Sequence, residues 1–249
     1  MVKSLRPSKP TALLIFHGEE APDYARLTDV LMIDHYPVPW LPLASFGQHV
    51  GLGRAALGPD KPLIAVVQAF DWNYFPELLP AEKNLRPPNF AELRCMTYSA
   101  LTQRANGLFF YAFEAGGWRI REHLETWDAV RRIVAEVNER LPLFEAEPLW
   151  WPKLHAFGDP ERRFNAALQS SVSAVLLRVR RGTHATPAGD YVLAVNTSAW
   201  SQEYRFTSPR PRAAAAPVLA ETRQLPVEAG WLADHFEPYA VHIYGPFGN

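Results

Sequence analysis

The sequence has little cysteine, no surplus of either charge and no long apolar run. It contains one cysteine, Cys95, among 249 residues, so an intramolecular disulfide is excluded. Its 25 Lys and Arg residues balance 26 Asp and Glu residues, and no basic stripe appears, so we expect neither nucleic acid nor a membrane surface as a partner. No stretch approaches the ~20 apolar residues of a membrane span. Residues 1–10 also lack the apolar core of a signal peptide. We expect a soluble product whose compartment is unknown.

Prolines and aromatic residues are plentiful. There are 23 prolines and eight tryptophans, and aromatic residues make up 12% of the chain. In the first half, prolines flank apolar runs of strand length and aromatic residues gather in the loops that follow these runs. Such aromatic residues can stack on sugar rings, although core packing uses them too.

The first 145 residues alternate apolar strand-like runs with helical segments. The strands are expected at 11–16, 29–33, 63–67 and 108–113, the last apolar on both faces, and helices at 21–28, 45–57, 93–105 and 118–141. Asn89 is the expected N-cap of the third helix, with Glu92 completing a capping box. This order predicts four parallel β/α units.

Beyond residue 144 the pattern becomes one of short strands separated by turns. We expect strands at 164–179, 191–196, 203–206, 218–221 and 239–244. The fold class is therefore α/β plus all-β. A domain of β/α units over residues 1–145 is followed by a C-terminal antiparallel β-sandwich over 146–249.

Candidate functional residues follow the carboxyl ends of the predicted strands, where α/β proteins place their chemistry. Glu114 and Asp34 are the candidate catalytic carboxylates. Glu114 could equally be a partner for an arginine, and Asp34 could lock the turn into His-Tyr-Pro. Candidate substrate-binding residues are His35, Tyr36, Gln68, Asp71, Trp72 and Tyr111. Their aromatic members, Tyr36, Trp72 and Tyr111, are either stacking platforms for a sugar ring or part of the core. The same two alternatives apply to Trp40.

Metal and cofactor binding are not expected. His17, Glu19 and Glu20 offer ligand atoms, but their spacing matches no recognised metal motif. Cys95 lies within an apolar helical segment, which favours a buried thiol over a nucleophile.

Three segments together resemble a known family. They are 29–37 (DVLMIDHYP), 62–70 (PLIAVVQAF) and 92–113 (ELRCMTYSALTQRANGLFFYAF), and they resemble the second half of a glycoside-hydrolase-type TIM barrel of the β-galactosidase-like clan. Residues 236–244 resemble the closing strand of the small β-domain that often follows such barrels. The resemblance implies a partial (β/α) barrel, a half-barrel of strands five to eight. Its first four strands would belong to a longer protein or to another chain.

The resemblance also implies a carbohydrate ligand. Retaining glycosidases need two carboxyl groups about 5 Å apart. In this clan the acid follows the fourth strand and a glutamate nucleophile follows the seventh. Here the fourth strand would be absent and the seventh ends in Gln68. We therefore expect a glycoside-hydrolase-like protein that acts on or binds an oligosaccharide or glycoside and is inactive as this chain alone. The alternative is a non-catalytic carbohydrate-binding or assembly protein on a degenerate barrel, which could self-associate through exposed sheet edges.

Overall fold

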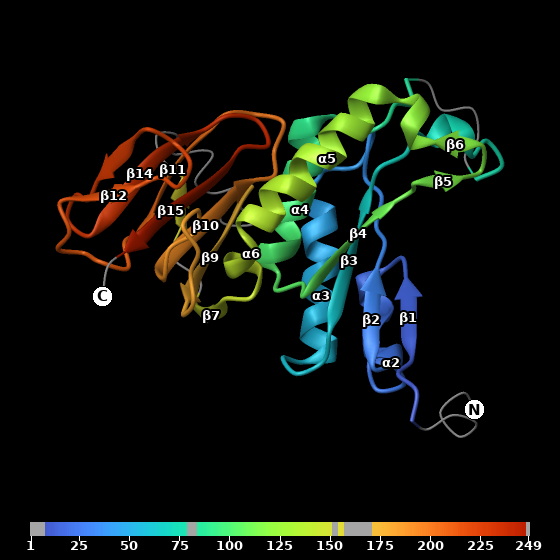
Figure 1. Ribbon diagram of the computed structural model, residues 1–249, viewed down its shortest axis with the longest axis horizontal. Helices are drawn as coiled ribbons and strands as arrows, with labels where there is room; N and C mark the ends of the chain where they lie inside the picture. The colour runs from blue at the N-terminus through green and yellow to red at the C-terminus, as the bar shows by residue number, and fades with distance from the viewer. Residues whose placement is uncertain (1–7, 79–83, 151–153, 157–170, 248–249) are drawn as a thin grey trace. The chain divides into compact units, whose positions relative to one another are not determined.

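The computed structural model describes residues 8–78, 84–150, 154–156 and 171–247 (Figure 1). Its internal contacts divide the chain into two compact units, one ending at Val134 and one starting at Ala135. We call them unit 1 and unit 2 and describe each by itself. The boundary at residue 145 expected from the sequence stays a prediction.

Unit 1 is built on a parallel sheet of four strands in the order β1-β2-β3-β4. The strands are β1 (Ala12–Ile15), β2 (Val30–Ile33), β3 (Leu63–Gln68) and β4 (Gly107–Tyr111). The segments between them hold η1 (Gly18–Glu20), α2 (Ala21–Tyr24), α3 (Ala44–Leu57), η2 (Trp72–Tyr74) and α4 (Phe90–Thr102). The predicted parallel sheet with intervening helices is present. Among the described strands, β1 and β4 are the sheet's two edges, and the sheet does not close into a barrel.

The two faces of this sheet differ. Leu31 and Ile33 are fully buried, and Gly53 of α3 lies so close to Ile33 that a Cβ there would be 3.1 Å from its side chain. On the other face, Leu14 of β1 and Phe109 of β4 are 43% and 56% exposed. The expectation that the run 108–113 is buried on both faces is therefore wrong, because alternate residues of β4 point to a face that stays accessible.

Helix α4 begins as its sequence predicts. The Asn89 side chain accepts a hydrogen bond from the Glu92 N–H at 3.0 Å, and the Glu92 carboxylate accepts one from the Asn89 N–H at 2.9 Å. Both outer nitrogens of the Arg86 guanidinium donate to the same carboxylate at 2.7 Å. The capping box is confirmed, and its glutamate is held on three sides.

The predicted helix over 118–141 starts later than expected. Trp118–Arg119 (β6) instead pairs with Glu114–Ala115 (β5) in a two-residue antiparallel ribbon. Gly116 and Gly117 make its turn at φ +57° and +87°, a region that favours glycine. After η3 (Ile120–Glu122), α5 runs from Leu124 to Glu139, and α6 (Leu141–Phe144) follows.

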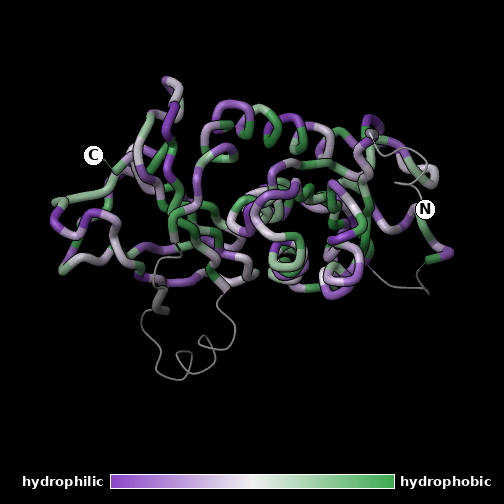
Figure 2. Tube along the Cα trace, turned by 90° about the horizontal axis from the view of Figure 1, so that it is seen from below, coloured by the Kyte–Doolittle hydropathy of each residue, from purple (hydrophilic) through white to green (hydrophobic). Residues whose placement is uncertain are grey.

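Unit 2 holds antiparallel sheets. One has the order β15-β10-β9-β7 and another the order β14-β11-β8, while β12 and β13 pair separately. The strands are β7 (Glu147–Trp150), β8 (Leu154–Ala156), β9 (Val172–Val179), β10 (Gly189–Asn196), β11 (Gln202–Thr207), β12 (Ala215–Pro217), β13 (Gln224–Pro226), β14 (Trp231–Phe236) and β15 (Val241–Phe247). Side chains of both larger sheets share one core, which includes Val192 and Phe206. In Figure 2, green apolar segments run along the strands inside this unit.

Two of the strands expected in unit 2 need comment. The prediction at 218–221 is wrong, because β12 ends at Pro217 and the chain then turns, with the Glu221 N–H bonded to the Val218 carbonyl at 3.1 Å. The expected strand 164–179 is present as β9 from Val172, and its part before residue 171 lies outside the described residues. Of the helices that the structure describes, none has the length and apolar character needed to cross a membrane.

Candidate functional site

The carboxyl ends of β2, β3 and β4 bring several predicted site residues together. Gln68 is the register partner of Tyr111, and Asp34 directly follows Ile33 at the end of β2. The Tyr36 ring stacks on Tyr111, with centroids 5.7 Å apart and planes inclined by 14°. These residues form one cluster at the strand ends of unit 1, which we call the strand-end cluster: Asp34, Tyr36, Trp40, Gln68, Phe70, Trp72 and Tyr111.

Asp34 is the chemically distinctive member of this cluster. Its residue is 6% exposed, and its Oδ1 atom has no hydrogen-bond partner among the described residues. Burial raises the pKa of its carboxyl from 3.8 to about 7, while a hydrogen bond from Tyr36 opposes part of this rise. The same burial raises the pKa of Tyr36, so its hydroxyl keeps its proton. Near neutral pH, Asp34 can therefore either donate or accept a proton.

His35 faces away from this cluster, because adjacent residues of an extended chain point in opposite directions. Its Nε2 lies 2.8 Å from the Ser45 hydroxyl, which itself donates to the Pro42 carbonyl at 2.7 Å, so the imidazole is the donor. Burial, assisted by nearby His49 and His17, lowers the pKa of His35 to about 4. His35 is thus a neutral, hydrogen-bonded ring against α3, and its role in substrate binding stays a prediction.

Gln68 is fully buried, and both ends of its amide are occupied. Its oxygen accepts from the Val38 N–H and its nitrogen donates to the Val38 carbonyl, each at 2.9 Å. The side chain fixes the loop after β2 to the end of β3. The hydroxyl-binding role expected of Gln68 stays a prediction, and it would require these bonds to break.

Asp71 and Trp72 lie in the segment that follows β3. Asp71 caps η2 by accepting from the Asn73 backbone at 2.8 Å and from its side chain at 3.1 Å. The Trp72 ring packs on Phe70 and Trp40, with centroids 4.8 and 5.7 Å away. The Trp72 Nε1 is buried and has no partner among the described residues, so it offers an unused donor beside the other rings.

Glu114 lies in the β5–β6 ribbon. Its side chain is 59% exposed and forms an ion pair with Arg119 at 3.2 Å across the ribbon. The arginine partner considered from the sequence is therefore present, and the catalytic role of Glu114 stays a prediction.

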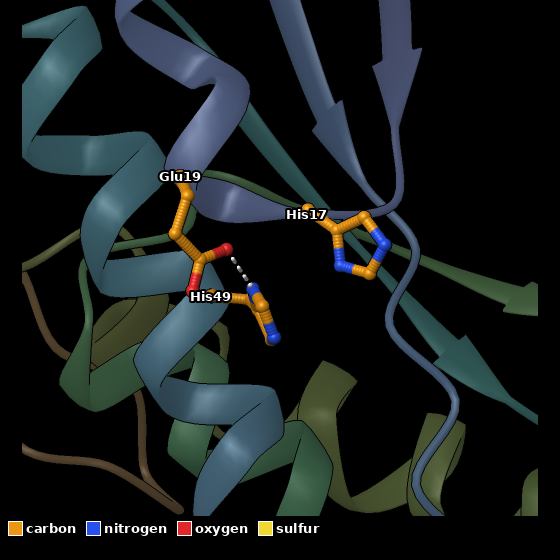
Figure 3. A group of neighbouring side chains, drawn as sticks. All are labelled: His17, Glu19 and His49. Atoms are coloured by element: carbon orange, nitrogen blue, oxygen red, sulfur yellow. Dashed lines mark ion pairs between the residues drawn. The ribbon is translucent and has the colours of Figure 1, made fainter.

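A second group of side chains joins His17 and Glu19, which were considered from the sequence, with His49, which was not. His17, Glu19 and His49 each offer one ligand atom, and these three atoms lie within 4.8 Å of one another (Figure 3). His49 is on α3, far from the other two in sequence, and no local spacing signals it. Glu20, considered with His17 and Glu19 from the sequence, does not join this group.

A cavity of about 950 Å³ lies at the opposite, amino ends of β1 and β2. Two charged groups of its lining, Lys61 and Asp29, are engaged in bonds within the fold. The Lys61 ammonium donates to the Ala25 and Thr28 carbonyls at 2.8 and 2.9 Å, and the Asp29 carboxylate accepts from the Thr11 N–H at 2.7 Å. These contacts hold the chain at the amino ends of the strands.

No protein-family model matches the sequence, and no curated protein matches it. Solved structures that resemble the chain include an α-amylase from Geobacillus thermoleovorans, at 9% identity and a TM-score of 0.42 over 91% of this chain and 62% of that one. The trehalulose synthase MutB from Pseudomonas mesoacidophila MX-45 matches at 13% identity and 0.42, over 91% and 53%. A glycoside hydrolase family 5 structure from Bacteroides vulgatus ATCC 8482 matches at 12% and 0.41, over 93% and 60%.

The chain spans 53–62% of the length of these three structures. At TM-scores of 0.41–0.42 and identities of 9–13%, these likenesses assign no role to any residue of this chain.

Proposed function

We propose that this chain is a glycoside-hydrolase-like protein that binds a glycoside or oligosaccharide at the strand-end cluster of unit 1 and does not hydrolyse it unaided. The observation that carries this proposal is the Asp34 carboxyl, which is buried, lacks a partner at Oδ1 and has a pKa raised to about 7.

The cluster has the two features that sugar recognition uses. The unpaired Asp34 oxygen is buried, so a sugar hydroxyl would donate to it only after the surrounding side chains move, and this bond would recover the free energy lost by burying that atom. Tyr111 and Trp40 are each 39% exposed, so each ring has accessible surface on which the apolar face of a pyranose could stack.

The absence of unaided hydrolysis follows from the state of the other candidate groups. A retaining mechanism needs two carboxyl groups about 5 Å apart. Glu114 is engaged with Arg119 and Asp71 with Asn73, while Gln68 is an amide bonded to Val38. None of these groups has the buried, unpaired state of Asp34.

Two assays test the proposal. Calorimetry with a panel of oligosaccharides should show binding to the parent protein. Binding should weaken at least about tenfold in Asp34→Asn, which loses a hydrogen-bond acceptor, and in Tyr111→Ala, which loses a stacking ring. Glu114→Gln should bind as the parent does. Incubation with aryl glycosides should give no turnover. Robust turnover that is lost in Glu114→Gln but kept in Asp34→Asn would contradict the proposal.

A second candidate is a non-catalytic assembly protein, favoured by the apolar edges of the parallel sheet. Leu14 on β1 and Phe109 on β4 are large and exposed, and both strands are edges among the described strands. Self-association through these edges would appear as a solution mass above that of one 28.1 kDa chain. A stable monomer at micromolar concentration that binds oligosaccharide would exclude the assembly protein and support the first candidate.

A further inference from the structure

We propose that His17, Glu19 and His49 form a binding site for one Zn²⁺ ion, separate from the strand-end cluster. The two imidazoles and one carboxylate come from two places in the sequence, the turn that leaves β1 and the second turn of α3.

The fold holds these places together by an unusually close backbone approach. Gly18 lies between His17 and Glu19, and a Cβ added to it would be 2.3 Å from the His49 carbonyl oxygen. Only a residue without a side chain lets the turn rest on α3 at this point. In Figure 3, a dashed line joins the neighbouring Glu19 and His49 side chains, and His17 lies across from them on the turn.

The distance between the Glu19 and His49 ligand atoms suits a shared metal ion. The His49 Nδ1 and the Glu19 carboxylate oxygen are 3.1 Å apart. With ligand bonds of about 2.1 Å, two ligands of one metal are about 3.0 Å apart in octahedral and about 3.4 Å apart in tetrahedral geometry. The exposed His17 would then turn inward to supply the third bond.

The hydrogen bonding of His49 also favours a cation. Its Nδ1 accepts a hydrogen bond from the Gly18 N–H at 2.9 Å, so this nitrogen carries a lone pair. A carboxylate oxygen and a lone pair thus face each other at 3.1 Å. A cation between them converts this repulsion into two coordinate bonds, and the Gly18 N–H gives up its acceptor.

The ligand set selects the metal. Zn²⁺ accepts nitrogen and carboxylate ligands readily, whereas Mg²⁺ and Ca²⁺ prefer oxygen. Three protein ligands leave a fourth tetrahedral position for water. The His35 ring packs against the His49 ring, with centroids 4.1 Å apart, and this contact restricts the His49 imidazole.

The test uses the untagged full chain and calorimetric titration with ZnCl₂ and, separately, MgCl₂. We expect one Zn²⁺ per chain and at least tenfold weaker binding of Mg²⁺. Zn²⁺ binding should weaken at least tenfold in His17→Ala and in Glu19→Gln. Two matched controls, Glu20→Gln on the neighbouring exposed glutamate and His184→Ala on an exposed histidine of unit 2, should bind Zn²⁺ as the parent does.

A second measurement reports on the site itself. Because Zn²⁺ would take the lone pair that the Gly18 N–H uses, the Gly18 amide resonance should shift during the titration in the parent and in Glu20→Gln. It should not shift in Glu19→Gln. Absence of Zn²⁺ binding, or binding that is unchanged in both His17→Ala and Glu19→Gln, would overturn the proposal. Since both ligand side chains are exposed, these variants should retain the parent's melting temperature without metal.

Discussion

The side-chain amide of Gln68 makes two hydrogen bonds with the backbone of a single residue, Val38, both 2.9 Å long. One amide thereby satisfies a buried N–H and a buried C=O of the loop after β2, the loop that presents Tyr36 and Trp40. The residue at the end of β3 is a structural element of the site, whatever it contributes to ligand binding.

Gln68→Glu should destabilise the protein by about 2–4 kcal/mol near neutral pH, because a carboxylate cannot donate to the Val38 carbonyl and would be a buried charge. Urea unfolding measures this change. The matched control is Gln48→Glu, on the exposed side of α3, which should change the free energy of unfolding by less than about 0.5 kcal/mol. Equal effects of the two substitutions would contradict the assigned role of Gln68.

Asp34→Asn should stabilise the protein relative to the parent as the pH rises. The folded-state pKa of Asp34 is raised from 3.8 to about 7, so the folded state holds its proton over a window in which the unfolded state has lost it. The stability that Asp34 contributes to the folded parent is therefore fully present below about pH 4 and is lost as the pH rises through about 7. The relative gain of Asp34→Asn between these limits should reach at most about 4 kcal/mol.

Urea unfolding of both proteins at several pH values between 4 and 8 measures this gain. The difference between the two proteins is needed because His35, with a pKa lowered to about 4, contributes a slope of the opposite sign in the same range. Asn cannot titrate, so a difference that stays constant with pH would show that the Asp34 pKa is unshifted.

Asp234→Asn should destabilise unit 2 by about 2–3 kcal/mol, since it removes one partner of a largely buried pair while Arg223 keeps some solvent contact. The Asp234 carboxylate accepts from two Arg223 nitrogens at 2.7 and 2.8 Å and from the Tyr244 hydroxyl at 2.6 Å. Burial raises the Asp234 pKa, but these bonds outweigh it and the net pKa is lowered. The stabilisation is therefore lost as the pH falls through this lowered value.

Chemical unfolding tests this prediction by comparing the midpoint of Asp234→Asn with that of an exposed control, Glu203→Gln. Similar midpoints would contradict the prediction.

Gly18→Ala and Gly47→Ala should have opposite effects. A Cβ at Gly18 would clash with the backbone of His49, so Ala should cost about 1–3 kcal/mol. A Cβ at Gly47, inside α3, would lie 3.5 Å from the nearest atom, an ordinary contact, and should stabilise the helix by up to about 1 kcal/mol. Thermal unfolding of the two single variants shows whether each substitution lowers or raises the stability of the protein. A stable Gly18→Ala protein would mean that the turn does not rest on α3.

Local signals in the sequence predicted much of unit 1. The apolar runs gave all four parallel strands, and the capping box of Asn89 and Glu92 gave the start of α4, because strand hydrophobicity and helix caps depend on neighbouring residues. The start of α5 was missed because the apolar periodicity continues back to Trp118, whereas the Gly116–Gly117 turn folds Trp118 into a ribbon. In unit 2, β14 (Trp231–Phe236) was not predicted, because the polar Asp234 occupies one of its buried positions and breaks the apolar alternation.

The candidate site was predictable only in part. Asp34, Tyr36 and Tyr111 lie near one another because the register of a parallel sheet brings its carboxyl ends to one edge, and their roles in a site stay predictions. The sequence could not show that the Gln68 amide is hydrogen-bonded to Val38, or that His49 lies next to Glu19. Both contacts join segments about 30 residues apart. Such contacts depend on how helices pack on the sheet, which no local pattern encodes.

Helix α5 sets a practical limit on how the chain can be divided. The division between the units at Val134 falls within this helix, which is unbroken from Leu124 to Glu139. The part before Val134 buries Val130 and Ile133, and the carbonyl of the last residue, Glu139, accepts from the Thr186 hydroxyl at 3.1 Å. Cleavage or truncation at Val134 would therefore leave a half-helix with unsatisfied backbone groups on each product. Separate expression of either unit would have to keep α5 whole.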